Sequence, residues 1–321
     1  MEYPSKKYRA KVTLGMCVKN AEGTVEKAIQ SVLGQNYPYE FMELIIVDGN
    51  SRDQTIQILT ENLKGKKLQT SIFYEAGGLG LARQIVVDKA TGAYIIWIDS
   101  DMILSKDFTR KQVNFMDAHL KAGIAKGKYC FQGRPENEQL VATLEDVEFV
   151  LSTLHEGVTD SKSLGTSGCI YRVKAIKQVG GFDLNIEGAG EDTDAENRIR
   201  AAGWELYITS AEFFETRRQN WHSLWNEYFW LGQGGQQILK KNSRNIELYK
   251  LIPAVALIFE LLRVPNAYRA TYRRVVILLP IHYTFKRLAW LLGFIKRRFT
   301  RDEQSKQFSQ SSNLKSVYIK H

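Results

Sequence analysis

Two aspartates follow an apolar stretch of the chain, and their spacing suits a metal ion. The run "AYIIWI" (Ala93–Ile98) is continuous, apolar and rich in β-branched and aromatic residues, which is typical of a strand buried on both faces. Asp99 and Asp101 follow in "WIDSDMIL". An unpaired carboxylate is costly to desolvate, and a hard divalent cation such as Mg²⁺ or Mn²⁺ would offset that cost. The alternative is a solvated turn, because aspartate is common in turns.

A second acidic segment, "GAGEDTDAENRIRAAGW", lies later in the chain. Ile199 and Ala202 follow it with helical spacing, so Glu191 and Asp192 are predicted to lie at the start of a helix. The helix dipole lowers the pKa of an acid there, whereas burial or a neighbouring carboxylate raises it. A carboxylate in this position could act as a general base. The alternative is that these acids, with Asp194, only enrich the first helical turn.

The segment "LGTSGCIYR" (Leu164–Arg172) precedes this acidic pair. Its small residues Thr166, Ser167 and Gly168 could let a ligand approach closely. A tight turn leading into a strand is an equal alternative. No Ser/His/Asp nucleophile motif is present in the sequence.

Strands and helices alternate along the first third of the chain. Strands are expected at 11–18, 42–48, 68–75 and 93–99, and helices at 25–33, 56–63 and 79–92, with Gly34 and Gly92 as stops. This alternation with short connections predicts an α/β fold with a mostly parallel, doubly wound sheet. Ligands of such sheets bind beyond the carboxyl ends of the strands. One crevice is therefore expected to collect Lys19, Asn20, Asp48, Ser51, Asp99 and Asp101.

Four ordered blocks of the sequence resemble family 2 glycosyltransferases, enzymes with the GT-A fold. They read "VTLGMCVKNAEGTVEKAIQSVLGQNYP", "ELIIVDGNSRDQT", "GGLGLARQIVVDKATGAYIIWIDSDMIL" and "GGFDLNIEGAGEDTDAENRIRAAGWEL". The resemblance covers Val12 to Thr209, about two thirds of the chain. One aspartate pair alone is weak evidence for a family, whereas four blocks in order with consistent spacing are strong evidence.

The resemblance implies a nucleotide-binding role for five residues. Cys17, Val18 and Lys19 match the first nucleotide-contacting turn of the family. Asp48 matches the carboxylate that accepts a hydrogen bond from the base, although it could instead cap a turn. Arg83 matches an arginine near the nucleotide, although it could instead be a solvated helix cation.

The resemblance also implies the chemistry of both acidic segments. Asp99, Ser100 and Asp101 match the DxD motif that holds the metal and the ribose-diphosphate. Asp192, supported by Glu191, matches the general base that takes a proton from the acceptor hydroxyl. With Arg83 and the metal stabilising the leaving nucleoside diphosphate, the reaction would be one in-line displacement with inversion.

Several positions depart from the family pattern. The tyrosine of the usual Pro-Thr-Tyr-Asn is Lys19 here, so base stacking must differ, and the usual second aspartate after Asp48 is Gly49. A metal-binding histidine is often found where this chain has Thr216 or Arg217, and His222 comes a few residues later. The QxxRW motif is absent, which disfavours a processive synthase.

Charge divides the chain into an acidic body and a basic tail. From Lys240 onward, 17 Lys/Arg and 4 Asp/Glu give a net charge of +13. Since the whole chain has a net charge of +9, the preceding 239 residues have 9 − 13 = −4. Between Tyr249 and Phe299, apolar clusters alternate with cations, and no apolar run reaches the ~18 residues of a simple spanning helix. Helices lying in a membrane interface are therefore expected, with Tyr283 and Trp290 at the headgroups. A helical subdomain that packs on the body or on a dimer partner is the alternative.

The expected organisation has three parts. Residues 1–215 form a GT-A catalytic domain, with a nucleotide-sugar half at 1–104 and an acceptor half at 105–215. Residues 216–300 form a basic, membrane-associating helical region that could also support oligomers. Residues 301–321 form a polar, disordered tail. The three cysteines contain no CxxC pair, and the charged start "MEYPSKKYRAK" has no apolar core of a signal peptide, so a cytosolic setting is expected.

The predicted function is that of an inverting, metal-dependent glycosyltransferase at the cytosolic face of the cell membrane. Its donor is a nucleoside diphosphate sugar, first a UDP-sugar and second GDP-mannose, and its acceptor is a lipid-linked molecule or a glycan. A catalytically inactive membrane-bound scaffold is the main alternative. A nucleotidyltransferase or dehydrogenase is disfavoured because the first turn, "MCVKNAEG", has no GxGxxG. Nucleic acid is disfavoured as a partner because the apolar clusters of the tail are large and helically spaced.

Overall fold

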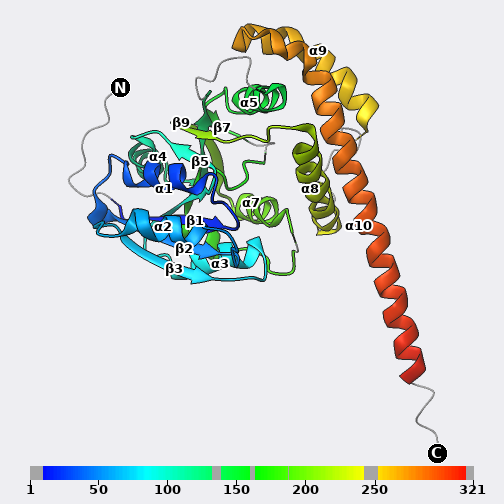
Figure 1. Cartoon of the computed structure of the whole chain (residues 1–321), viewed down its shortest axis with the longest axis horizontal. Coiled ribbons are helices and arrows are strands. Elements are labelled where there is room, and N and C mark those ends of the chain that lie inside the picture. The colour runs from blue at the N-terminus through cyan, green and yellow to red at the C-terminus, as the bar shows by residue number, and fades with distance from the viewer. Residues whose placement is uncertain (1–9, 132–138, 160–162, 187, 242–251, 316–321) are drawn as a thin grey trace, which may run out of the picture. The chain divides into compact units, whose positions relative to one another are not determined.

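The computed structural model describes residues 10–131, 139–159, 163–186, 188–241 and 252–315. The chain forms two compact units. The α/β unit consists of Met1–Glu187 and Glu191–Arg218, and the helical unit consists of Gly188–Gly190 and Gln219–His321. The labels of Figure 1 are used for their elements.

The described residues of the α/β unit form a single sheet with helices on its faces. Its strands are β1 (Val12–Val18), β2 (Met42–Asp48), β3 (Gln69–Tyr74), β4 (Tyr94–Asp99), β5 (Met102–Leu104), β6 (Ala122–Tyr129), β7 (Gly157–Val158), β8 (Cys169–Arg172) and β9 (Glu205–Glu215). Its helices are α1 (Val25–Leu33), η1 (Tyr39–Phe41), α2 (Thr55–Leu63), α3 (Leu79–Lys89), α4 (Phe108–Ala118), α5 (Leu140–Ser152), α6 (Val173–Gln178) and α7 (Glu191–Ala201).

The strand order β3-β2-β1-β4-β8-β6-β9-β5 divides the sheet into two halves, with β7 paired to β9. Strands β3, β2, β1 and β4 are all parallel. In the other half, β8 is antiparallel to β4 and β6, while β6 and β9 are parallel. The prediction of a mostly parallel α/β sheet is confirmed. The antiparallel strand β8 brings the second half of the chain beside the first.

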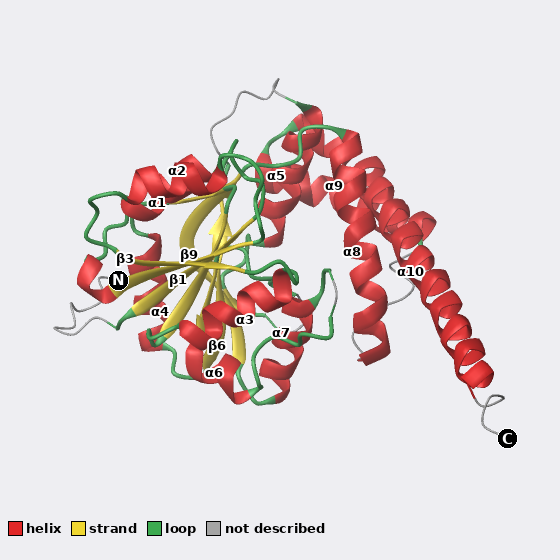
Figure 2. Ribbon diagram, turned by 60° about the horizontal axis from the view of Figure 1, so that its bottom comes forward, coloured by secondary structure: helices red, strands yellow, loops and turns green. Residues whose placement is uncertain are grey.

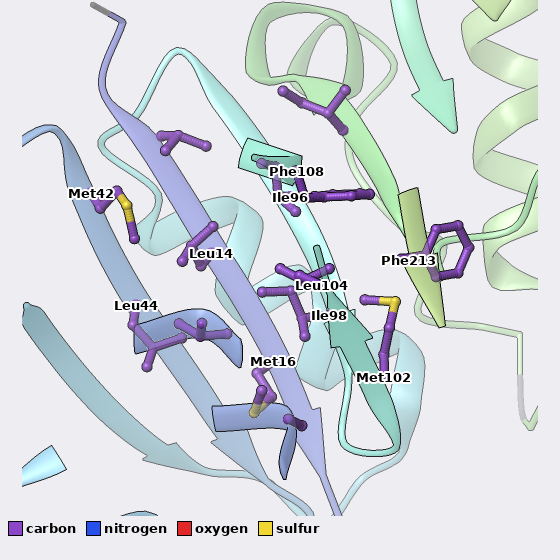
Figure 3. Close-up of a cluster of buried hydrophobic side chains, with 14 of the residues drawn as sticks. Leu14, Met16, Met42, Leu44, Ile96, Ile98, Met102, Leu104, Phe108 and Phe213 are labelled. Carbon is purple, nitrogen blue, oxygen red and sulfur yellow. The ribbon is translucent and has the colours of Figure 1, made fainter. Parts of the chain in front are cut away.

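Helices cover both faces of the sheet, as expected for a doubly wound fold (Figure 2). One core lies under α1, α2 and α4 and includes Leu14, Ile96 and Phe108 (Figure 3). The other lies under α3, α6 and α7 and includes Trp97 and Tyr171. Because both faces of β1, β2 and β4 are buried, these strands read as continuous apolar runs.

Two predicted boundaries differ from the structure. Helix α3 ends at Lys89, three residues before the predicted stop at Gly92. Gly92 instead passes close to β1, where a Cβ would lie 2.7 Å from the Thr13 nitrogen. At the other end of the chain, α10 extends to Lys315 through a segment predicted to be disordered. Its Glu, Gln and Lys residues have good helix propensity, so polarity alone does not end a helix.

The helical unit consists of α8 (Trp221–Lys241), α9 (Pro253–Thr271), η4 (Arg274–Leu278) and α10 (Leu279–Lys315). Helices α8 and α10 approach backbone to backbone, because a Cβ at Gly232 would overlap the Trp290 carbonyl and one at Gly293 would overlap the Phe229 carbonyl. Lys286 is buried, with its Nζ 4.4 Å from the centroid of the Tyr228 ring.

One helical stretch, Arg274–Phe299, is long and apolar enough to cross a membrane, with a mean hydropathy of 1.4. This corrects the expectation that no segment meets that criterion. Counting only uninterrupted apolar runs was too strict, because Lys286 and Arg287 interrupt the run without making the helix polar. The finding concerns length and composition only, since the core helix of a soluble protein can meet the same criterion.

Candidate active site

The predicted nucleotide-binding residues meet at the carboxyl ends of three parallel strands. Cys17 of β1 is in register with Asp99 of β4, and Val18 of β1 is in register with Asp48 of β2. Burial raises the pKa of the Cys17 thiol to about 12, so this thiol is neutral at physiological pH. Cys17 therefore has no thiolate with which to act as a nucleophile.

A hollow of about 280 Å³ lies at this edge of the sheet. It is lined by Lys19, Asn20, Gly49, Asn50, Arg52 and Ala76. A Cβ at Gly49 would lie 3.2 Å from both Cβ and Cδ of Lys19. The two departures from the family pattern are therefore neighbours in space, because the Lys19 stem occupies the room that a side chain at position 49 would take.

Asp48 is almost completely buried and is engaged in a turn. Its Oδ2 accepts a hydrogen bond from the Ser51 N–H at 3.0 Å, and its Oδ1 accepts one from the Ser51 hydroxyl at 2.5 Å. The Ser51 hydroxyl oxygen in turn accepts the Asn20 N–H at 2.9 Å. A carboxylate offers about four lone-pair sites, so Asp48 can still accept a hydrogen bond from an N–H group of the nucleobase. Its match to the base-binding residue stays a prediction.

Asp99 and Asp101 lie in a cluster with a third carboxylate, that of Glu215. Glu215 ends β9 and is in register with Met102 of β5, directly after Asp101. The Thr216 N–H donates to the Asp101 carbonyl at 2.9 Å. Burial, together with the charges of Asp99 and Glu215, raises the pKa of Asp101 to about 7. Carboxylates that repel one another in this way are stabilised by a divalent cation.

The residues of this cluster fit a hard divalent cation. Carboxylate oxygens are the ligands that Mg²⁺ and Mn²⁺ prefer, and Asp99 and Asp101 supply them on either side of Ser100. Glu215 also pairs with Arg217 at 2.5 Å. Sequence reasoning missed Glu215 because only the antiparallel pairing of β5 with β9 brings it near Asp101.

Thr216 and Arg217, followed by Arg218, lie where the resembling family often has a histidine. Arg217 stacks on the Phe149 ring, with its guanidinium carbon 3.5 Å from the ring centroid. The charges of Arg218 and Arg217 oppose the rise in the pKa of Asp101. His222 belongs to the helical unit, where it is exposed on α8 and its Nε2 lies 3.1 Å from the Asn226 amide nitrogen.

Arg83 forms a buried ion pair with Glu191. The Arg83 Nη1 on α3 donates to the Glu191 Oε1 at the start of α7, and these residues are 7% and 1% exposed. Gly80 of α3 also lies beside Glu191, where an added Cβ would be in ordinary contact at 3.5 Å from the Glu191 Cγ. Burial raises the pKa of Glu191 and the Arg83 charge opposes that rise. The side chain of Glu191 is therefore committed to Arg83.

Asp192 lies in the first turn of α7, as the sequence predicted. Its Oδ1 accepts the Thr193 N–H at 2.7 Å. Its Oδ2 faces Gly165, where a Cβ would lie 3.5 Å away. No donor among the described residues bonds to this Oδ2. One oxygen is thus held by the helix start while the other can accept a proton.

Arg83 connects the two acidic groups. Burial opposes the charge of Arg83, but the charges of Glu191, Asp192 and Asp99 outweigh it and raise the Arg83 pKa, so Arg83 remains a cation. The structure therefore brings Cys17, Asp99, Arg83 and the start of α7 into one region. Such a region can hold an anionic group, accept a proton and keep a fixed positive charge between the two.

A family profile matches the part of the chain that builds most of this region. The family described as "Glycosyl transferase family 2" matches residues 13–180, which are 168 of the 321 residues. The match includes the strand ends and Arg83 and stops short of Glu191.

Relatives with similar sequences are also transferases. An "Uncharacterized glycosyltransferase" of Haemophilus influenzae is 34% identical over 150 residues, which are 46% of this chain and 57% of the relative. The poly(ribitol-phosphate) β-N-acetylglucosaminyltransferase TarS of Staphylococcus aureus is 30% identical over 105 residues, which are 31% of this chain and 18% of TarS. The chain thus matches less than two thirds of the length of either relative.

Solved structures share the fold over most of the chain. The mannosyltransferase PcManGT of Pyrobaculum calidifontis, solved with GDP-Man and Mn²⁺, has a TM-score of 0.62 at 17% identity. The match covers 92% of the present chain and 88% of the PcManGT chain. Residues 1–349 of S. aureus TarS, solved with UDP-GlcNAc, have a TM-score of 0.51 at 15% identity. This match covers 90% of the present chain and 92% of the TarS chain. At these identities the similarity is one of fold.

Proposed function

This chain belongs to glycosyltransferase family 2, and we propose that it moves a sugar from a nucleoside diphosphate donor to an acceptor hydroxyl with inversion at the anomeric carbon. One observation carries the proposal. Arg83 is paired with Glu191 at the start of α7, and the charge of Asp99, at the end of β4, also acts on it. A diphosphate bound at Asp99 would direct its sugar toward the start of α7.

Asp99 and Asp101 are the proposed ligands of a divalent cation, Mn²⁺ or Mg²⁺. Such an ion, when bound, neutralises charge that develops on a diphosphate leaving group. The donor set supports this assignment, because burial and the charges of Asp99 and Glu215 raise the pKa of Asp101, and a bound cation would offset that repulsion. PcManGT, which has the same fold, was solved with Mn²⁺.

Asp192 is the proposed general base. Its Oδ2 accepts the proton of the acceptor hydroxyl while that oxygen attacks the anomeric carbon, and the bond from this carbon to the diphosphate breaks in the same displacement. Glu191 and Arg83 act as a fixed pair. The pair keeps a positive charge beside the leaving group and holds the start of α7 in place.

The proposed donor is a UDP-sugar, with GDP-mannose as the second choice. The nucleobase of the donor would lie in the hollow beside Lys19, near Cys17 and Val18. Asp48 would accept a hydrogen bond from it. A UDP-sugar is preferred because TarS, which is similar in sequence and in fold, was solved with UDP-GlcNAc. GDP-mannose is second because PcManGT was solved with GDP-Man.

The proposed setting is the cytosolic face of the membrane, with a lipid-linked or glycan acceptor. Large apolar side chains form an exposed stripe along η4 and α10, with helical spacing: Ile277, Ile281, Leu288, Leu292, Ile295 and Phe299. Lys296 and Arg298 lie beside the end of this stripe and are exposed. An apolar helix face with flanking cations favours binding to anionic lipid.

Thermal unfolding tests the donor class and the metal together. The protein is heated with UDP or GDP, each with and without Mn²⁺, beside Asp101→Asn and the control Asp88→Asn. Asp88 is an exposed aspartate on α3 that accepts a hydrogen bond from Gln84. A nucleotide at 100 times its Kd adds ~2.7 kcal/mol of stability.

We expect one nucleotide to stabilise the parent and Asp88→Asn only with Mn²⁺, and to leave Asp101→Asn unchanged. Stabilisation without Mn²⁺, or equal stabilisation of Asp101→Asn, would contradict the metal assignment. A folded parent that responds to neither nucleotide would contradict the proposed function and favour a non-catalytic scaffold.

A further inference from the structure

The segment Gly188–Gly190 stands directly before the start of α7 in the sequence, yet it belongs to the helical unit. The α/β unit resumes at Glu191, and the candidate general base Asp192 follows at once. Ala189, in the middle of the segment, is only 5% exposed. The start of α7 therefore continues, with no residue in between, from a segment that packs within the helical unit.

Helix α8 packs against this segment at backbone distance. A Cβ at Gly234 would overlap the Ala189 carbonyl and would lie 2.8 Å from the Ala189 Cβ. One turn further along α8, the Ile238 Cγ1 lies 2.8 Å from the place of a Cβ on Gly190. Carbon atoms that are not bonded prefer separations of about 3.5–4.0 Å, so the contact in this form requires glycine at positions 190 and 234.

The backbone of the segment has a conformation that the free chain does not keep by itself. Gly188 and Gly190 have φ angles of 85° and 107°, in the region that residues with side chains disfavour. Glycine enters this region easily and leaves it equally easily, because it has more conformational freedom than any other residue. The contacts with α8 therefore select the course that the chain takes before Glu191.

Other contacts of α8 hold the helix itself in place. A Cβ at Gly235 would overlap the Trp290 ring of α10, and a Cβ at Gly232 would overlap the Trp290 carbonyl. Helices α8 and α10 both belong to the helical unit. Neighbouring glycines of α8 thus serve different contacts, because Gly234 packs on the segment and Gly235 packs on α10.

Two separate contacts fix the start of α7. Within the α/β unit, Glu191 is paired with Arg83. Within the helical unit, Gly190 is packed on Ile238, one residue before Glu191. A general base must lie within hydrogen-bond reach of the proton that it takes, and a misplacement of about 1 Å can lower the rate on the order of 100-fold. The contact with α8 therefore bears on the chemistry of Asp192.

We propose that Gly234 and Ile238 of α8 are positioning residues for Asp192. They hold Gly188–Gly190 in its course, and this segment sets where α7 begins. The inference rests on the proposed function and gives the helical unit a task in the reaction, besides its proposed contact with lipid. Loss of the contact frees the two glycines, and the Asp192 carboxylate then spends less time within reach of the acceptor hydroxyl.

Steady-state kinetics tests this inference on the full chain with Mn²⁺ and UDP-N-acetylglucosamine or GDP-mannose, whichever donor the parent hydrolyses. The variants are Gly234→Ala and Ile238→Ala. The matched controls are Gly235→Ala, which adds a Cβ on the α10 side of the same helix, and Ile238→Val, which keeps both γ carbons. Calorimetry measures the Kd of the nucleoside diphosphate, and thermal unfolding measures the stability of each variant.

We expect Gly234→Ala to lower kcat at least ~10-fold, because the added Cβ displaces the segment, and Ile238→Ala to lower it at least ~3-fold. Gly235→Ala and Ile238→Val should keep kcat within ~2-fold of the parent, although both glycine variants lose thermal stability. The KM of the donor and the Kd of the nucleoside diphosphate should stay within ~2-fold in all variants, because residues of the α/β unit line the nucleotide hollow.

Three results would overturn the inference. One is an equal kcat in Gly234→Ala and Gly235→Ala, whether both values fall or both persist. Another is a loss of nucleoside diphosphate affinity in Gly234→Ala that accounts for its lower activity. The third is an equal kcat in Ile238→Ala and Ile238→Val, and this pair decides if Gly234→Ala does not fold. A parent that binds neither UDP nor GDP and hydrolyses neither donor would instead contradict the proposed function, on which the inference depends.

Discussion

Single carboxylates in the candidate site have different tasks because their surroundings differ. Glu191 is committed to Arg83, whereas Asp192 keeps one oxygen without a protein donor among the described residues. Burial and the neighbouring charges of Asp99 and Glu215 raise the pKa of Asp101, and Asp48 accepts a hydrogen bond from the Ser51 hydroxyl. The assignments of base, metal ligand and turn residue follow from these contacts more than from residue type.

Replacing Asp192 by asparagine is expected to remove the proton acceptor without removing the donor site. The kcat for transfer or donor hydrolysis should fall about 10²- to 10⁴-fold, as for loss of a general base. The Kd of the nucleoside diphosphate should stay within ~2-fold, because the nucleotide hollow lies at the ends of β1 and β2. Asp88→Asn serves as the control, and a loss of nucleotide affinity in Asp192→Asn would count against the assignment.

Glu196 is expected to make stability depend on pH. Burial, reinforced by the charge of Asp192, raises its pKa from 4.5 to about 8. Hydrogen bonds from Leu164 and Ser163 and the charge of Lys126 oppose this rise. Between these two pH values the unfolded chain has released the proton and the folded chain still binds it, so stability falls as the pH rises, by up to a few kcal/mol.

Urea unfolding of the metal-free protein at both ends of this pH window measures the effect, with Glu196→Gln beside the parent. The decline should be smaller in Glu196→Gln. The pKa of Asp101 is also raised, so Asp101 makes the stability of both proteins fall as the pH rises. The contribution of Glu196 is therefore the difference between the declines of the parent and of Glu196→Gln. Equal declines would show that Glu196 is ionised in the folded protein throughout the window.

At the scale of elements, α3 is positioned by an unusually close contact with the sheet. Gly15 of β1 lies under this helix, and a Cβ there would come within 2.7 Å of the Val86 Cγ1 and 3.1 Å of the Trp97 ring. This contact fixes the height of α3 above the strands. The same helix carries Arg83, so its position also determines where the Arg83–Glu191 pair forms.

Gly15→Ala is therefore expected to lower the free energy of unfolding by about 1–3 kcal/mol, as overpacking does in cores. Gly23→Ala is the matched control, because a Cβ at that position meets nothing within 4 Å. Its effect should stay within ~0.5 kcal/mol. Urea unfolding measures both, and equal stabilities would show that α3 can move outward without cost.

At the scale of the whole molecule, two units of different character share one chain. The α/β unit carries the candidate active site, and the helical unit exposes an apolar stripe on α10. An exposed apolar patch often marks a contact with a protein or a membrane. The proposed partner is lipid, which would keep the enzyme near a lipid-linked acceptor.

Replacing Leu288 and Leu292 by serine is expected to weaken binding to vesicles of phosphatidylcholine and phosphatidylglycerol at least ~10-fold, because apolar area at the lipid contact is lost. The control replaces Leu120 and Leu184, which are also exposed but lie in the α/β unit. Co-sedimentation measures the binding. Equal retention of the two double variants on vesicles would exclude the α10 stripe as the lipid contact.

The sequence by itself determined the parallel half of the sheet and the acidic positions at its edge. Periodicity and strand ends are local patterns, so they predicted β1, β2 and β4, placed Asp99 and Asp101 after a buried strand, and put Asp192 at a helix start. The ordered blocks then indicated the family, which the profile match confirms.

Only the tertiary structure decided how distant side chains combine. Arg83 and Glu191 are 108 residues apart, and Lys126 and Leu164 are 38 apart. Neither pairing leaves a periodic signal, because the contact depends on α3 meeting α7 or on the route of the chain into β8. The partner of a buried charge is chosen by packing, and packing is a property of the folded chain as a whole.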